Sequence, residues 1–132
     1  MYIETRPHAK QFLKACSEIF IIYVYTAGRK RYADTVLDAV DTEGLITQRF
    51  YRETCRKVNG AVVKDLRYLK KITKCKNEMI LIDDNSDSIN NNYPFALKID
   101  AFEGDQSDKG LIKAFETVMK FYHWSMKTTN LK

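Results

Sequence analysis

Residues 20–40, "FIIYVYTAGRKRYADTVLDAV", decide the fold of this chain. Residues 20–26 are apolar, aromatic and β-branched without alternation, which predicts a strand covered on both faces. Gly28 interrupts the run, and residues 30–40 then place apolar side chains at helical spacing. A buried strand that feeds a helix is the repeating unit of a parallel α/β sheet.

The segments before and after this stretch continue the alternation. Apolar spacing predicts a helix over 7–18, and "EMILID" at 78–83 reads as a second buried strand. "FALKI" at 95–99 reads as a short third strand. A final helix is expected after Ser107 as its cap, with Asp108 in the first turn.

The middle of the chain predicts a small β-hairpin outside the main sheet. Residues 45–51 form a weaker strand pattern, and Asn59-Gly60 between extended residues is a strong hairpin signal. A short helix is expected over 65–71. The fold class is therefore α/β: a Rossmann-like open, mostly parallel sheet with flanking helices and a small β-hairpin, in one domain over 1–126 followed by a polar tail at 127–132.

Composition restricts the functional classes. The longest apolar run, at 19–27, is too short for a membrane span, and no signal-peptide pattern opens the chain. The three cysteines form no C-x-x-C pair, so we expect a reducing, intracellular location, nuclear or cytoplasmic rather than mitochondrial. The net charge of +5 favours an acidic partner. A nucleic-acid partner is unlikely because the basic residues are not interleaved with stacking aromatics.

Polar residues follow two of the predicted buried strands. Thr26 ends the first, and Asp83 and Asp84 end the second. Ligands of open α/β sheets bind beyond the carboxyl ends of strands, so these residues could share a crevice. A hydroxyl before a helix suits phosphate, carboxylates suit Mg²⁺, and Lys64 after the hairpin could hold a phosphate oxygen. Each has a structural alternative: a helix-capping hydroxyl, a solvated lysine, and a helix cap or turn.

The order Thr, Lys, Asp-Asp along the chain fits the haloacid dehalogenase superfamily; a response-regulator receiver would have its acidic pair at the first strand. The sequence resembles the small C-terminal-domain phosphatases, also called NLI-interacting-factor-like phosphatases, from about Tyr2 to Met119. The blocks that carry the resemblance are "RPHAKQFL", "YTAGRKRYADTVLD", "RFYRETCRKVNGAVVKDLRYL", "ILIDDNSDS" and "FEGDQSDKGL".

The resemblance implies a Mg²⁺-dependent protein phosphatase acting on phosphoserine or phosphothreonine, such as those in the tail of RNA polymerase II, through an aspartyl-phosphate intermediate. By position, Thr26 would bind phosphate, Lys64 would hold the phosphoryl group, and Asp84 beside Asp83 would complete the magnesium shell. Tyr32 and Arg52 match positions on the peptide-binding side. Two departures are mild: Asn85-Ser86 replaces a common Ser-Pro, and Gly28 stands where Ser is common.

The family's opening motif, D-x-D-x-T, has no match in these 132 residues. Its first Asp attacks phosphorus, and Asp34, Asp38 and Asp41 cannot replace it because they lie on or after the first crossover helix rather than at a strand end. In-line positioning is most of phosphoryl-transfer catalysis. We therefore expect no turnover by the family mechanism from this chain as it stands, and weakened or lost Mg²⁺ binding.

In the superfamily, that motif's strand lies between the strand ending at Thr26 and the strand ending at Asp83. Its absence predicts either a gap in the middle of the sheet or direct pairing of those two strands, and an unpaired hydrophobic edge could recruit a second copy. Three explanations are open: a longer phosphatase whose start lies upstream, a pseudophosphatase that binds phosphopeptides or a protein partner, or a strand supplied by another molecule. A mitochondrial presequence receptor shares the domain, but would normally carry a membrane anchor, and none is visible.

Overall fold

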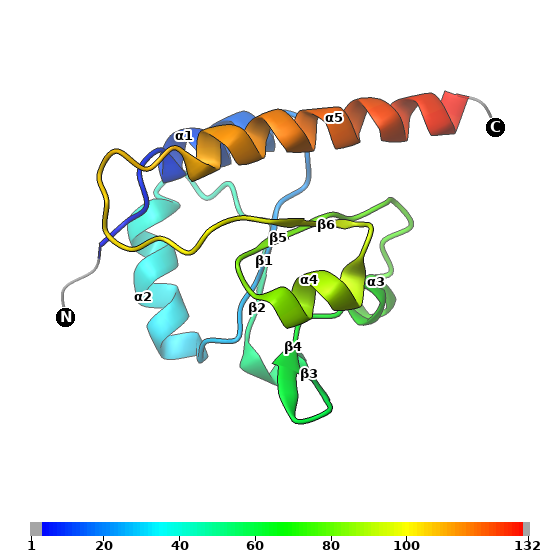
Figure 1. The fold of residues 1–132 in the computed structure, drawn as a ribbon, viewed down its shortest axis with the longest axis horizontal. Helices are drawn as coiled ribbons and strands as arrows, with labels where there is room; N and C mark the ends of the chain where they lie inside the picture. The colour runs from blue at the N-terminus through cyan, green and yellow to red at the C-terminus, as the bar shows by residue number, and fades with distance from the viewer. Residues whose placement is uncertain (1–3, 131–132) are drawn as a thin grey trace.

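The computed structural model describes residues 4–130 and shows helices and strands alternating along the chain (Figure 1). The helix expected over 30–40 and the hairpin turn at Asn59-Gly60 are both confirmed. The elements in order are α1 Ala9–Ser17, β1 Tyr23–Tyr25, α2 Lys30–Val40, β2 Gln48–Phe50, the 3₁₀ turn η1 Arg52–Thr54, β3 Arg56–Val58, β4 Ala61–Val63, α3 Leu66–Thr73, β5 Leu81–Asp83, α4 Ser86–Asn92, β6 Ala96–Lys98 and α5 Gly110–Asn130.

The sheet is divided into two parallel halves. β1 pairs with β2, aligning Tyr25 with Phe50, and β5 pairs with β6, aligning Asp83 with Lys98. The antiparallel β3–β4 hairpin is separate from both. Within residues 4–130, no hydrogen-bonded ladder joins β1 to β5. The α/β class is confirmed, and the break lies where the resemblance places the opening strand.

The direction of the backbone groups identifies the unpaired edges. The Thr26 N–H donates to the Phe50 carbonyl, and the Ile22 carbonyl accepts from Thr47, so these even-numbered residues face β2. Alternate residues of a parallel strand bond to opposite neighbours, which turns the backbone of Tyr23 and Tyr25 away from β2. By the same alternation, Leu81 and Asp83 face β6 and Ile82 faces away from it.

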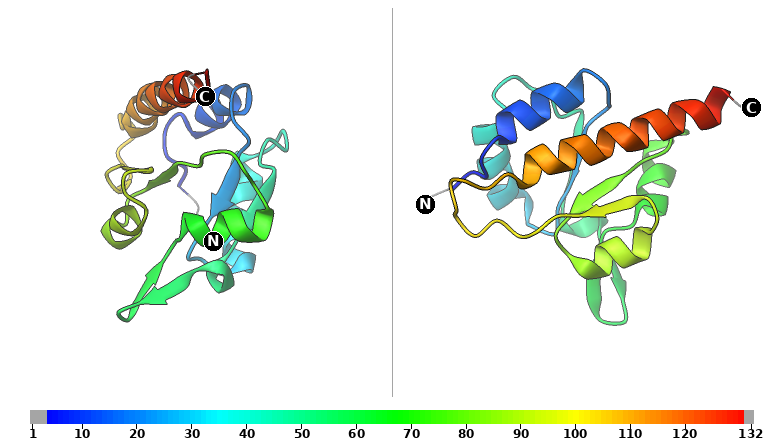
Figure 2. Two further views of the ribbon diagram at one scale, coloured as in Figure 1. Left: turned by 90° about the vertical axis from the view of Figure 1, so that its right-hand side faces the viewer. Right: turned by 45° about the horizontal axis from the view of Figure 1, so that its top comes forward.

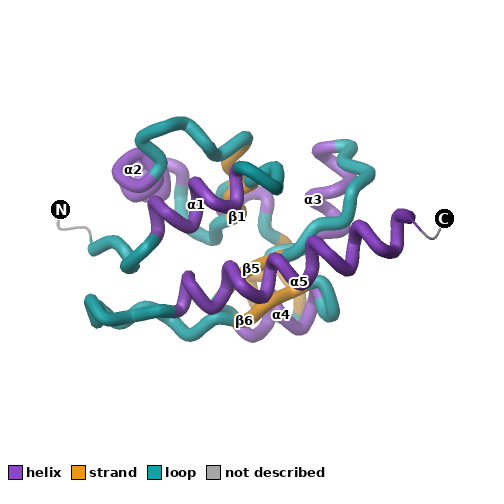
Figure 3. The backbone as a smooth tube through the Cα atoms, turned by 90° about the horizontal axis from the view of Figure 1, so that it is seen from above, coloured by secondary structure: helices purple, strands orange, loops and turns teal. Residues whose placement is uncertain are grey.

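The helices cover the strands unequally. α1 and α5 lie side by side on one side of the strands, and the hairpin projects from the opposite side (Figures 1 and 2). Phe20, three residues after the end of α1, meets Tyr122 of α5 edge to face with 5.6 Å between the ring centroids. Seen from above, α5 crosses over β5 and β6 (Figure 3). This leaves the hairpin side, where β1 and β5 end, for the candidate site.

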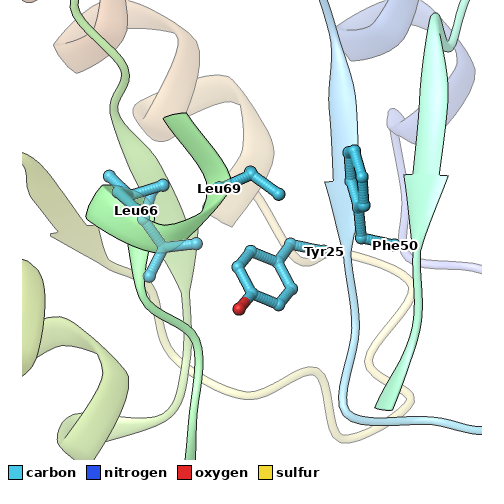
Figure 4. Packing of buried hydrophobic residues seen from close by; sticks show 5 residues of the cluster. Tyr25, Phe50, Leu66 and Leu69 are labelled. Carbon is cyan, nitrogen blue, oxygen red and sulfur yellow. The ribbon is translucent and has the colours of Figure 1, made fainter. Parts of the chain in front are cut away.

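The main hydrophobic cluster bridges the two halves of the sheet. Tyr25 and Phe50 come from β1 and β2, and Leu66 and Leu69 of α3 lie across from the Tyr25 ring (Figure 4). Leu81 of β5 completes the buried set. Side-chain packing therefore connects the strand pairs that backbone hydrogen bonds do not.

Several predicted element boundaries are corrected. α1 begins at Ala9 rather than at 7, because His8 has a φ of 71° and cannot be helical. α5 begins at Gly110, whose N–H donates to the Asp108 carboxylate, so Asp108 rather than Ser107 caps the helix. α5 also continues to Asn130, beyond residue 126 where the polar composition predicted a tail.

Two further observations complete the fold. α4, Ser86–Asn92, was not predicted as a helix, because its sequence "SDSINNN" has little apolar periodicity. Among the residues described, no helix has both the length and the apolar character needed to cross a membrane.

Candidate phosphate-binding site

The predicted site residues lie at the carboxyl ends of the strands, as expected for an open α/β sheet. Thr26 directly follows β1, and Lys64 directly follows β4. Asp83 is the last residue of β5, and Asp84 comes next. The structure divides these residues into two groups, one around Lys64 and Asp83 and one around Thr26.

Lys64 and Asp83 form a buried ion pair. The Lys64 ammonium lies 2.7 Å from Asp83 Oδ2, and their side chains are only 16% and 7% exposed. The other oxygen, Oδ1, accepts the Asp84 backbone N–H at 2.8 Å. A charge removed from water has to be paired, and this contact satisfies both partners. The two other ammonium protons of Lys64 can still donate to a phosphate oxygen.

The backbone of Lys64 is held by two side chains of α4. Its N–H donates to Ser88 Oγ at 3.1 Å, and its carbonyl accepts from Asn92 Nδ2 at 2.7 Å. Asn92 Oδ1 in turn accepts the Leu66 N–H at 2.8 Å. Ser88 and Asn92 are 1% and 8% exposed. Sequence reasoning missed these two residues; the signal available was a run of polar side chains immediately after the acidic pair.

Thr26 forms the start of a tight turn. Its hydroxyl accepts the Gly28 N–H at 2.9 Å, which leaves the hydroxyl proton able to donate to a ligand. Arg52, the first residue of η1, holds the same turn: its N–H donates to the Gly28 carbonyl and its guanidinium donates to the Ala27 carbonyl. A Cβ on Gly28 would lie 3.2 Å from Thr26 Oγ1, so a serine here would require a small shift.

The two residues predicted on the peptide-binding side lie around this turn. Tyr32 is 57% exposed on the first turn of α2, close to Gly28. Arg52 is also exposed, and its guanidinium reaches over the Thr26 turn. Thr26, Tyr32 and Arg52 are therefore brought together on one solvent-facing surface.

The residues present do not complete a magnesium site. Asp84 is exposed and unbonded through its carboxylate within the described structure, but both oxygens of Asp83 are already used. No group of three or more potential metal ligands occurs among residues 4–130. Mg²⁺ can be bound by one or two carboxylates with phosphate and water, so Asp84, beside Asp83, could supply a ligand to a shell completed from elsewhere.

Asp34 is committed to a structural role on α2. Its carboxylate is bound by Lys30, Tyr51 and Arg49. These hydrogen bonds, led by that from Lys30, hold the pKa of Asp34 well below its usual range. This agrees with the expectation that Asp34 does not replace a catalytic aspartate.

The parallel strand pairs, the helices around them and the site at the strand ends place the chain in the haloacid dehalogenase type of α/β phosphatase fold. The chain belongs to the NLI interacting factor-like phosphatase family, which it matches over residues 1–129.

Individual relatives agree with this assignment. The chain is 37% identical over 112 residues to a "Probable C-terminal domain small phosphatase" of Dictyostelium discoideum, covering 85% of this chain and 36% of the relative. It is 32% identical to "Nuclear envelope morphology protein 1" of Schizosaccharomyces pombe, covering 92% and 26%. The solved structure of Fcp1, "an essential RNA polymerase II CTD phosphatase", aligns with a TM-score of 0.61 and 27% identity, covering 97% of this chain and 37% of that one. The chain thus spans between 26% and 37% of the length of these relatives.

Proposed function

We propose that this chain is the phosphoserine- or phosphothreonine-recognising part of a protein phosphatase domain, and that on its own it binds a phosphorylated peptide without hydrolysing it. The observation that carries the proposal is the buried Lys64–Asp83 pair at a strand end, which presents an ammonium group where a phosphoryl group would lie. The phosphatase names of the relatives support the substrate class.

The absence of hydrolysis follows from the carboxylates that the chain contains. Attack on phosphorus needs a free carboxylate aimed in line at the phosphoryl group. Asp83 is held by Lys64, Asp34 on α2 is held by three donors, and Asp84 is exposed after the strand end. A D-x-D-x-T strand placed between β1 and β5 would supply the missing nucleophile and the further magnesium ligands.

The first experiment tests whether this chain hydrolyses phosphate esters. Hydrolysis of p-nitrophenyl phosphate and of a phosphoserine peptide is measured with Mg²⁺, beside a version extended upstream by an Asp-x-Asp strand if the gene encodes one. We expect activity only in the extended form. Magnesium-dependent turnover by the 132-residue chain, lost on Asp84→Asn, would contradict the proposal.

Binding is tested by titrating the phosphoserine peptide into the ¹⁵N-labelled chain and following its amide resonances. Lys64→Ala is expected to weaken binding of the phosphorylated peptide. Lys57→Ala on the exposed hairpin strand β3 is the matched control and should bind as the wild type does. The unphosphorylated peptide should cause no shifts; equal shifts with both peptides would favour a binding module that ignores phosphate.

A further inference from the structure

The two groups of the candidate site belong to parts of the fold that strand pairing does not connect. Thr26 follows β1, whereas Lys64 follows the hairpin and contacts Asp83 at the end of β5. In the described part of the chain, β1 and β5 share no ladder. If one phosphoryl group is to touch both Thr26 and Lys64, another contact has to set the spacing between them.

The Tyr25 side chain provides such a contact. Its hydroxyl donates to the Thr54 carbonyl at 2.7 Å and accepts the Asp65 N–H at 3.3 Å. Tyr25 immediately precedes Thr26, and Asp65 immediately follows Lys64. A single hydroxyl therefore joins the backbone next to one candidate residue to the backbone next to the other.

The Tyr25 hydroxyl lies in a buried environment that keeps its hydrogen bonds in place. The residue is 9% exposed, and its ring is directed toward Leu66 and Leu69 of α3 (Figure 4). Burial raises the pKa of Tyr25, so the hydroxyl keeps its proton and continues to donate. Removing the hydroxyl would leave its hydrogen-bond partners unsatisfied and shielded from water. The free-energy cost of this is larger than the net stabilisation from the hydrogen bond itself.

The other polar link between the groups is weaker. The Cys55 thiol lies 3.6 Å from the Thr26 carbonyl, and a thiol is a poor donor. Tyr23, two residues earlier on β1, packs its ring against Phe50, and no hydrogen bond to its hydroxyl occurs in the described structure. Tyr23 is therefore a suitable control for Tyr25, because it has the same side chain on the same strand but does not form the bridging hydrogen bonds.

We propose that Tyr25 is a positioning residue whose hydroxyl bridge holds Thr26 in register with Lys64, so that both can bind one phosphoryl group. This inference rests on the proposed function, since it concerns the same phosphate site.

The test compares Tyr25→Phe with the control Tyr23→Phe, using orthophosphate as the probe and the ¹⁵N-labelled chain for detection. Tyr25→Phe removes both hydrogen bonds of the bridge and is expected to weaken phosphate binding by about five- to tenfold. Tyr23→Phe should bind as the wild type does. Equal affinity of the two variants would overturn the inference while leaving the proposed function intact.

A double-mutant cycle distinguishes positioning from general destabilisation. In the wild type, Thr26→Val and Lys64→Ala should each weaken phosphate binding. On the Tyr25→Phe background, Thr26→Val should cost little more, because Thr26 is already out of register, while Lys64→Ala keeps its effect. If the losses of affinity caused by Tyr25→Phe and Thr26→Val were additive, the positioning role would be overturned.

A second measurement needs no variant. Phosphate bound across both groups should strengthen the bridge, so hydrogen exchange of the Asp65 amide should slow when orthophosphate is added to the wild-type chain. An unchanged rate despite saturable phosphate binding would contradict the bridge. Failure of the wild type to bind phosphate at all would instead remove the proposed function, and this inference with it.

Discussion

Lys64 and Asp83 are brought together from the end of a hairpin and the end of a parallel strand, with 2.7 Å between Nζ and Oδ2. Neither charge is well solvated, so each depends on the other. Breaking the pair should therefore destabilise the domain as well as alter its candidate site, and these two effects can be measured separately.

Lys64→Met is expected to destabilise the domain by about 3 kcal/mol, because it leaves the Asp83 carboxylate buried without a counter-charge. Urea unfolding would give this value. The double variant Lys64→Met/Asp83→Leu should recover most of the loss, since it removes both charges. Lys71→Met, at an exposed position of α3, is the control and should stay within about 0.5 kcal/mol of wild type. A double variant less stable than Lys64→Met alone would contradict this interpretation.

Asn92→Ala tests the support beneath Lys64. The substitution leaves the Lys64 carbonyl and the Leu66 N–H without their side-chain partner in a buried site. We expect a loss of about 2 kcal/mol in the free energy of unfolding, typical of an unsatisfied buried polar group. Asn90→Ala, on the exposed side of the same short helix, should change it by less than about 0.5 kcal/mol. Similar losses in both variants would contradict the role of the Asn92 hydrogen bonds, since alanine has the higher helix propensity and cannot itself cause a loss.

The features that follow from local rules were predictable. The turn residues Asn59 and Gly60 both adopt positive φ, at 51° and 83°, as the hairpin signal requires. Gly28 ends the first strand, and α2 has the range that its apolar spacing predicts. Thr26, Lys64 and Asp83 could be placed at strand ends because the order of elements decides where strand ends lie.

The features that depend on distant partners were not predictable from local patterns. α4 is polar except for Ile89. Its place is set by hydrogen bonds that Ser88 and Asn92 form with the backbone of Lys64, which lies 24 and 28 positions earlier in the chain. The Tyr25 hydroxyl spans 40 positions to reach Asp65. The break between β1 and β5 was expected from the resemblance to a family, since no periodicity in the chain itself indicates a missing neighbour.

Asp34→Asn should reveal a pH-dependent contribution to stability. Hydrogen bonds from Lys30, Tyr51 and Arg49 hold the pKa of Asp34 below its ordinary value of 3.8. A depressed folded-state pKa stabilises the protein above the unfolded pKa, and this contribution is lost as pH falls below 3.8 toward the folded value.

The measurement is thermal unfolding of the wild type and Asp34→Asn across pH 3 to 7, about the range in which carboxylates titrate. The difference in melting temperature should be constant above about pH 5 and shrink as the solution is acidified through 3.8. Asp100→Asn, which removes an exposed carboxylate with no bonded partner in the described structure, should show no such trend. A difference that grows on acidification would mean that the Asp34 carboxylate is not stabilised by these contacts.

Gly60→Ala should destabilise the hairpin, whereas Asn59→Gly should leave its stability almost unchanged. Gly60 has a φ of 83° with open space around it, so an added methyl group meets no neighbour and the cost is conformational, about 1 kcal/mol. Asn59, at 51°, already carries a side chain in the left-handed region, so glycine should be tolerated there with little loss. Urea unfolding would measure both effects, and amide exchange over β3 and β4 would show whether they are local.

Because β4 leads directly into Lys64, Gly60→Ala should also weaken phosphate binding. If the hairpin is loosened but phosphate binding is unchanged, the position of Lys64 would be set by Ser88 and Asn92 alone.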